Sequence, residues 1–90
     1  MSEIKVEKLS GEEINQRGIS DWPIWTKEIS RFDWHYDEQE QCLFLEGDVE
    51  VETDGEETIR IGPGDFVTFP KGLSCAWNVK APVKKHYRFG

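Results

Sequence analysis

The sequence predicts an all-β fold, a small sandwich or barrel of short strands. Runs of apolar or alternating residues recur at close, even spacing along the chain. Turn-forming glycine and proline residues separate these runs, as in Gly62-Pro63-Gly64 and Pro70-Lys71-Gly72. No segment after Gly18 shows a helical period. The chain has 90 residues, which suffice for one domain and not for two.

The first 21 residues are expected to form a strand and a turn segment ahead of the barrel. Residues 4–9 alternate apolar and polar side chains, as a half-buried strand does. Ser10 stands three residues before Glu13, which is the spacing of a capping box, and Gly18 can close a helical turn. A helix of about two turns or a loop both fit this segment.

The barrel is expected to span residues 22–90. Pro23 forbids a central strand at its own position. Asp54-Gly55 predicts a hairpin turn between two alternating segments. Together with the first strand, eight or nine strands are expected, at residues 4–9, 26–29, 32–36, 42–45, 49–53, 58–61, 66–69, 74–79 and 83–89.

The charge of the chain argues against two classes of partner. There are 11 Lys and Arg against 18 Asp and Glu, so the net charge is −7. Nucleic acid and anionic membranes repel such a domain. The acidic residues are concentrated between Glu46 and Glu57, where they alternate as the solvent face of strands does.

The same inspection predicts a cytoplasmic protein. No apolar run approaches the roughly 18 residues that span a bilayer, and the N-terminus has no signal-peptide pattern. Cys42 and Cys75 are too few for a domain stabilised by several disulfides, which favours a reducing compartment.

The aromatic content is high for so short a chain. There are four Trp, two Tyr and five Phe. These rings can supply the bulk that a small core lacks, or they can line a pocket. Both interpretations stay open at this stage.

Two stretches resemble the cupin superfamily, whose members are small jelly-roll barrels, also called double-stranded β-helices. In the first stretch, six residues separate Glu40 from Gly47, which matches the second half of the first cupin motif. His35 then takes the place of its second histidine and Asp33 that of the first, while the leading glycine is missing.

The second stretch matches the second cupin motif in its turn residues. Gly64, Pro70 and Gly72 have the motif's spacing, and Cys75 takes the place of its histidine. Asn78 lies one residue ahead of the motif's asparagine.

From Trp22 almost to the C-terminus the chain more narrowly resembles the small single-domain cupins grouped with (S)-ureidoglycine aminohydrolase. The segments that carry this likeness are Trp-Pro-x-Trp, Phe-Asp-Trp-His-Tyr-Asp, Leu-Glu-Gly, Gly-Asp-Phe-Val-x-Phe-Pro-Lys-Gly and Lys-Lys-His-Tyr. The aminohydrolase reaction belongs to longer proteins with two cupin domains and a manganese site.

The resemblance implies a divalent metal site, with Asp33, His35, Glu40 and Cys75 at the ligand positions. Carboxylate, imidazole and thiolate donors suit zinc or iron, and manganese is the metal of the relatives. The alternative is a barrel without metal. Glu40 is then a lining carboxylate, His35 a hydrogen-bonded core residue and Cys75 a small buried hydrophobe.

The same residues are the catalytic candidates, although the sequence leaves open whether the chain is an enzyme. Glu40 would act as a general base, His35 as an acid or base, and Cys75 as a nucleophile. On a regular strand Glu40, Cys42 and Phe44 share one face, and Tyr36 faces away from His35. The candidates for binding a ligand are Trp25, Tyr36, Cys42, Phe44 and Trp77.

Three functions fit this pattern. The first is a cupin that binds a small polar or anionic metabolite in its barrel, with or without a divalent metal. The second is a non-catalytic, metal-free barrel that acts as a binding or dimerisation module, such as a homodimer. The third is a subunit-like interaction protein that uses Trp22, Trp25 and edge strands at an interface.

Overall fold

The computed structural model describes residues 4–53 and 57–90. Two long strands form the centre of its sheet. β4 (Glu40–Thr53) and β7 (Ser74–Phe89) pair antiparallel along almost their whole length, from Glu40 opposite Phe89 to Thr53 opposite Cys75. The remaining elements are β1 (Lys5–Lys8), α1 (Gly11–Gln16), the 3₁₀ turn η1 (Ile19–Asp21), β2 (Ile24–Lys27), β3 (Ser30–His35), β5 (Thr58–Ile61) and β6 (Asp65–Phe69).

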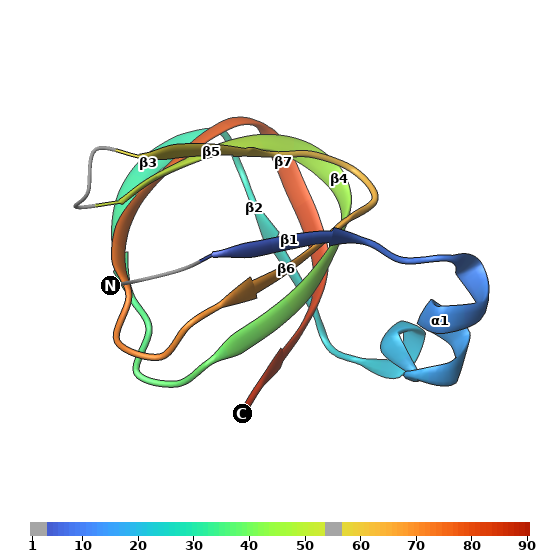
Figure 1. Cartoon of the computed structure of the whole chain (residues 1–90). Coiled ribbons are helices and arrows are strands. Elements are labelled where there is room, and N and C mark those ends of the chain that lie inside the picture. Colours follow the sequence, from blue (N-terminus) through green and yellow to red (C-terminus); the bar gives the residue numbers. More distant parts are fainter. Residues whose placement is uncertain (1–3, 54–56) are drawn as a thin grey trace.

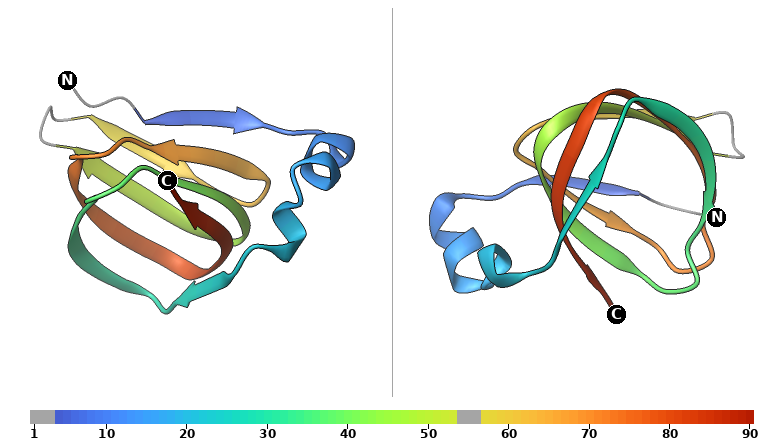
Figure 2. Two further views of the ribbon diagram at one scale, coloured as in Figure 1. Left: turned by 90° about the horizontal axis from the view of Figure 1, so that it is seen from below. Right: turned by 180° about the vertical axis from the view of Figure 1, so that it is seen from behind.

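Each long strand bends and takes part in two facing layers (Figures 1 and 2). One layer joins β3, the first half of β7, the second half of β4 and β5. The other joins β2, the second half of β7, the first half of β4, β6 and β1. This arrangement confirms the predicted all-β jelly roll. The sheet path ends at β1 and β2, which do not pair with each other, so hydrogen bonds do not close the barrel.

The bend of β4 lies at Gly47. The register against β7 shifts between Phe44 and Val49, which marks a bulge. Gly47 has a φ of 120°, and a Cβ there would lie 2.9 Å from Val83 Cα and 3.0 Å from the Pro82 carbonyl oxygen. Only glycine therefore allows the two strands to approach so closely while they bend.

The predicted strand count was wrong, because the described residues form seven strands rather than eight or nine. Glu46-Gly47 and Ala81-Pro82 were interpreted as strand ends, and the structure uses both as bends within continuous strands. A proline is tolerated there because its missing N–H falls in the irregular part of the ladder. The Asp54-Gly55 turn lies outside the described residues.

The N-terminal segment follows the local signals of the sequence. Ser10 Oγ accepts a hydrogen bond from the Glu13 N–H at 3.1 Å, and the Glu13 carboxylate accepts one from the Ser10 N–H at 3.3 Å, so the capping box is confirmed. Gly18 ends this short helix with a φ of 67°. The segment packs on the outer side of the sheet, where it forms a second apolar cluster of Ile19, Leu43 and Phe66 with Leu9, Ile14 and Trp22.

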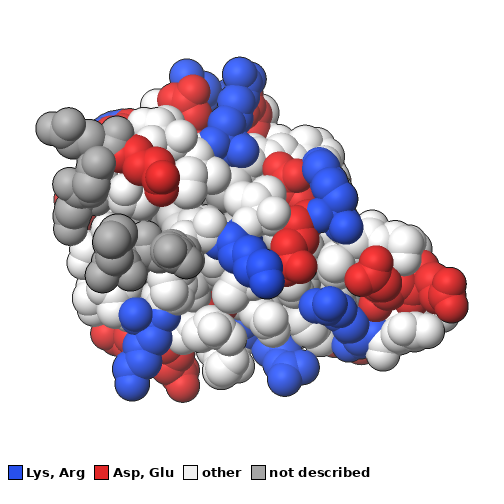
Figure 3. All heavy atoms as spheres, in the orientation of Figure 1, with Lys and Arg blue, Asp and Glu red and all other residues white. Residues whose placement is uncertain are grey.

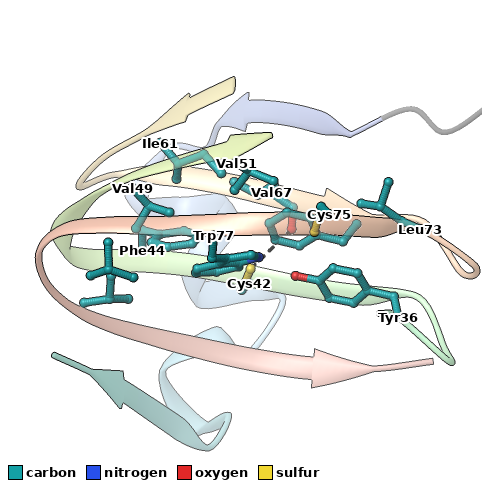
Figure 4. Close-up of a cluster of buried hydrophobic side chains, with 13 residues drawn as sticks. Tyr36, Cys42, Phe44, Val49, Val51, Ile61, Val67, Leu73, Cys75 and Trp77 are labelled. Atoms are coloured by element: carbon teal, nitrogen blue, oxygen red, sulfur yellow. Dashed lines mark hydrogen bonds between the residues drawn. The ribbon is translucent and has the colours of Figure 1, made fainter. Parts of the chain in front are cut away.

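The main core fills the space between the two layers (Figure 4). Its centre is aromatic: the Tyr36 ring stacks on Phe69 at 4.8 Å, and Trp77 lies 5.7 Å from Phe69 and 6.1 Å from Phe44. The buried members are Tyr36, Cys42, Phe44, Val49, Val51, Ile61, Val67, Phe69, Leu73, Cys75, Trp77, Val79 and Val83.

The acidic strands carry their charges on the outer surface, in cross-strand ion pairs. Arg31 binds Glu52 through two hydrogen bonds of 2.8 and 3.0 Å, and Arg60 binds Asp48 in the same way at 3.0 and 3.2 Å. Lys80 lies 3.2 Å from Glu50. Figure 3 shows positive and negative side chains interspersed on one face of the molecule. None of the described helices is long and apolar enough to span a membrane.

Replacement of Gly47 by Ala tests the bend. We expect a loss of about 2–4 kcal/mol in the free energy of unfolding, because a Cβ at a positive φ strains the backbone and collides with Val83. Urea unfolding monitored by tryptophan fluorescence measures it. Gly11→Ala is the matched control, because nothing lies within 4 Å of its added Cβ. Equal stability of the two variants would show that the bend does not need glycine.

Candidate functional site

An aromatic cavity of about 200 Å³ opens between the two layers. Alternation along β7 builds much of it, since Trp77, Lys85, Tyr87 and Phe89 all occupy odd positions of one strand. Strands β2, β3 and β4 supply most of the rest. The complete lining is Trp25, Phe32, Trp34, Tyr36, Glu40, Trp77, Lys85, Tyr87 and Phe89.

Glu40 and Lys85 form a buried ion pair in the wall of this cavity. Lys85 Nζ donates a hydrogen bond to Glu40 Oε2 at 3.0 Å, and the two residues are only 3% and 4% exposed. They are the two charged residues among those that line the cavity. A charge buried this deeply requires a partner, because removal from water strongly disfavours an isolated ion.

The Lys85 ammonium group also lies over four aromatic rings. Its Nζ is 4.8 Å from the centre of the Trp77 ring and 4.9 Å from that of Trp25. The rings of Phe44 and Phe69 follow at 5.6 and 6.0 Å. The negative faces of these rings attract the cation, so they hold Lys85 in place together with Glu40.

Two polar atoms of the lining have no hydrogen-bond partner among the described residues. They are the Tyr36 hydroxyl oxygen and Trp77 Nε1. Figure 4 shows the Tyr36 hydroxyl pointing into the cluster toward Trp77. Burial raises the pKa of Tyr36 far above its usual value, and the neighbouring Glu40 adds to this, so the phenol stays protonated. Both atoms are enclosed by neighbouring side chains.

The four residues expected to bind metal do not form one cluster. Within residues 4–53 and 57–90, no group of three or more His, Cys, Asp or Glu side chains could hold a metal ion. Asp33 and His35 are exposed, and His35 Nδ1 lies 2.8 Å from Ser74 Oγ. Glu40 lies in the cavity wall, bonded to Lys85.

Strand alternation explains the separation. The chain turns Tyr36 into the core, so His35 and Asp33 face the outer side of β3. The motif comparison placed the same two residues inside the barrel. Asp33, His35 and Cys75 do border one hollow of about 580 Å³ at the end of the sheet, but Glu40 is not part of it.

The candidates for ligand binding divide into two groups. Trp25, Tyr36 and Trp77 line the cavity. Cys42 and Phe44 face the same side of β4 as Glu40, but they lie in the core and do not line the cavity. Cys42 Sγ lies 3.7 Å from the Val67 carbonyl oxygen.

Sequence reasoning missed five cavity residues, and one of them is central. Lys85 lies outside both cupin motifs. The sequence does contain a sign of its burial. Lys85 occupies the same strand face as Val83, Tyr87 and Phe89, so it is a lysine within an otherwise apolar pattern. The other four are Phe32, Trp34, Tyr87 and Phe89.

Comparisons with known proteins identify similar chains. Residues 14–87 match the family model of the EutQ-like cupin domain. A DUF861 family protein from Thermotoga maritima is 50% identical, with a TM-score of 0.96 over 98% of this chain and 100% of that one. No curated protein matches the sequence.

Two EutQ proteins show the same fold at lower identity. A putative ethanolamine utilization protein Q from Salmonella typhimurium is 25% identical with a TM-score of 0.67, over 96% of this chain and 68% of that one. EutQ from Clostridium difficile is 18% identical with a TM-score of 0.67, over 98% and 68%.

Single substitutions test the buried ion pair. Glu40→Gln and Lys85→Met should each lower the free energy of unfolding by about 3–5 kcal/mol, because each leaves one buried charge without its partner. The double variant should be less destabilised than either single variant, since no uncompensated charge remains.

Urea unfolding of all three variants measures the coupling between Glu40 and Lys85. Arg31→Met and Glu52→Gln are matched controls on an exposed pair, and their effects should be much smaller. Additive losses at Glu40 and Lys85 would contradict the interaction.

Thiol reactivity tests the burial of Cys42. Burial raises the pKa of Cys42 to about 12, against the opposing effect of Lys85. At pH 8 roughly one thiol in ten thousand would then be ionised, and the thiolate is the reactive form. Iodoacetamide should therefore leave Cys42 unmodified in the native protein and alkylate it in urea, as measured by peptide mass spectrometry. Rapid alkylation of native Cys42 would contradict this environment.

Proposed function

The chain belongs to the EutQ-like cupin family, and we propose that it binds a small polar metabolite in its aromatic cavity through Glu40 and Lys85. One observation carries this proposal: a buried ion pair stands in the wall of an apolar cavity that opens to solvent. Such a cavity with a few convergent polar groups is the usual form of a small-molecule site.

A contribution to folding stability does not by itself explain why this ion pair is present. A hydrophobic pair of similar volume in the same place is often as stable or more stable, because desolvation of two charges offsets much of their attraction. Charged groups placed at a cavity wall can instead hydrogen-bond a ligand where water is largely excluded. The position of Glu40 and Lys85 therefore supports a binding role.

The dimensions of the cavity limit the ligand. A volume of about 200 Å³ is below the range of roughly 300–1,000 Å³ that drug-sized ligands occupy. Trp34 and Phe89, each 45% exposed, lie at the edge of the cavity, so part of the bound molecule can reach the solvent. The proposed ligand is accordingly a small metabolite.

The proposal involves no metal ion held by Asp33, His35, Glu40 and Cys75, because these side chains do not come together. For the same reason it does not include the reaction of (S)-ureidoglycine aminohydrolase. A small molecule remains the proposed partner, and the acidic charge gives no reason to add nucleic acid or a membrane. A homodimer and a cytoplasmic location stay predictions from the sequence.

The four tryptophans provide a direct test. Trp25, Trp34 and Trp77 line the cavity, whereas Trp22 packs in the second apolar cluster against Phe66 at 6.3 Å. Titration of ¹⁵N-labelled protein with a panel of small polar fragments should shift the indole N–H signals of the first three. The Trp22 signal should stay in place, and single Trp→Phe variants assign all four.

The Glu40→Gln, Lys85→Met double variant should lose these shifts for fragments that bind the wild type. If no fragment of the panel shifts the indole N–H signals of Trp25, Trp34 and Trp77, the proposal is contradicted. Shifts that appear only at Trp22 would contradict it as well.

A further inference from the structure

We propose that the cavity selects a neutral carboxamide carried on a flat apolar group. This inference rests on the proposed function, since it names the class of ligand that the same cavity takes. It follows from the two opposite charges that stand side by side in the cavity wall and from the rings around them.

The wall of the cavity offers both a donor and an acceptor. The Lys85 ammonium group has three N–H donors, of which one goes to Glu40 Oε2. The Glu40 carboxylate accepts that bond through one oxygen and has lone pairs for further donors. A ligand that meets this pair must therefore supply an acceptor to Lys85 and a donor to Glu40.

A carboxamide has this combination in one planar group. Its carbonyl oxygen can accept from Lys85. Its NH₂ group can donate to the Glu40 carboxylate. A plain hydrocarbon would displace water from both charged groups without replacing its hydrogen bonds, so the amide has an advantage over it.

Electrostatics favours a neutral ligand over a charged one. Glu40 and Lys85 are the two charged residues among those that line the cavity, and their charges cancel. A carboxylate ligand would satisfy the donors, but it would place a second negative charge beside Glu40. An ammonium ligand would face Lys85 and would offer it no acceptor. Either ion would lose its hydration without a net opposite charge.

The remainder of the lining suits a flat apolar group. Trp25, Phe32 and Tyr87 are partly buried, and Trp34 and Phe89 lie further out with 45% of each exposed. Aromatic rings pack well against planar apolar groups, either edge-to-face or stacked. The polar end of the ligand then lies at Glu40 and Lys85, and the flat group extends toward the solvent.

Three one-ring probes separate the possible charge classes: benzamide, benzoate and benzylamine. Isothermal titration of the wild-type protein at pH 7 should show that benzamide binds at least tenfold more tightly than either ion. Benzoate or benzylamine binding as tightly as benzamide would overturn the inference. If the cavity indole signals shift in that case, the proposed binding function still stands.

Charge-altering variants test the origin of the selectivity. Glu40→Gln leaves a net positive site, so the ratio of benzoate to benzamide affinity should rise at least tenfold. Lys85→Met leaves a net negative site and should raise the ratio for benzylamine in the same way. Glu38→Gln and Lys71→Met, at exposed positions, are the matched controls and should keep the wild-type order.

The double variant covers the case in which a single variant does not fold. Because its cavity carries no charge, it should retain the fold, bind benzamide at least tenfold more weakly and prefer neither ion. Unchanged benzamide affinity in the double variant would overturn the inference. Failure of all three probes to bind the wild type would also overturn the inference. The proposed binding function would be contradicted only if the wider fragment panel also left the cavity indole signals unchanged.

Discussion

The antiparallel pairing of β4 with β7 is the constraint on which the rest of the structure depends. Both strands run through the two layers, and every other strand except β1 pairs with one of them. The close approach at Gly47 lets them bend together. Because Glu40 lies on one long strand and Lys85 on the other, the same pairing that forms the jelly roll also brings the two charges together.

The local signals of the sequence predicted the fold well. Ser10 and Glu13 formed the expected capping box, and strand alternation placed Glu40, Cys42 and Phe44 on one buried face. The number of strands was wrong because glycine and proline mark bulges as well as turns, and Gly47 and Pro82 mark bends within strands. Pairing with a partner strand far along the chain decides between these alternatives, and periodicity does not contain that information.

The site was predicted only in part, for a related reason. Trp25, Tyr36, Glu40 and Trp77 come together around one cavity, whereas Asp33 and His35 lie outside it. Motif spacing counts residues along the chain, but the side that a residue faces depends on its parity within the strand. Lys85 belongs to neither cupin motif and was missed as a cavity residue, although its charge balances that of Glu40. The charged groups in the cavity wall are the Lys85 ammonium and the Glu40 carboxylate, and aromatic rings surround them.

All but one of the cavity residues belong to β2, β3, β4 or β7, and Tyr36 directly follows β3. A site built on paired strands is rigid before its ligand arrives, so little conformational entropy is lost on binding. It also constrains evolution. A binding site on loops can diverge by insertion and deletion, whereas an inserted residue in a strand turns every following side chain to the other face. Related proteins with this cavity can therefore acquire new ligands mainly through exchanges of single side chains on an unchanged backbone.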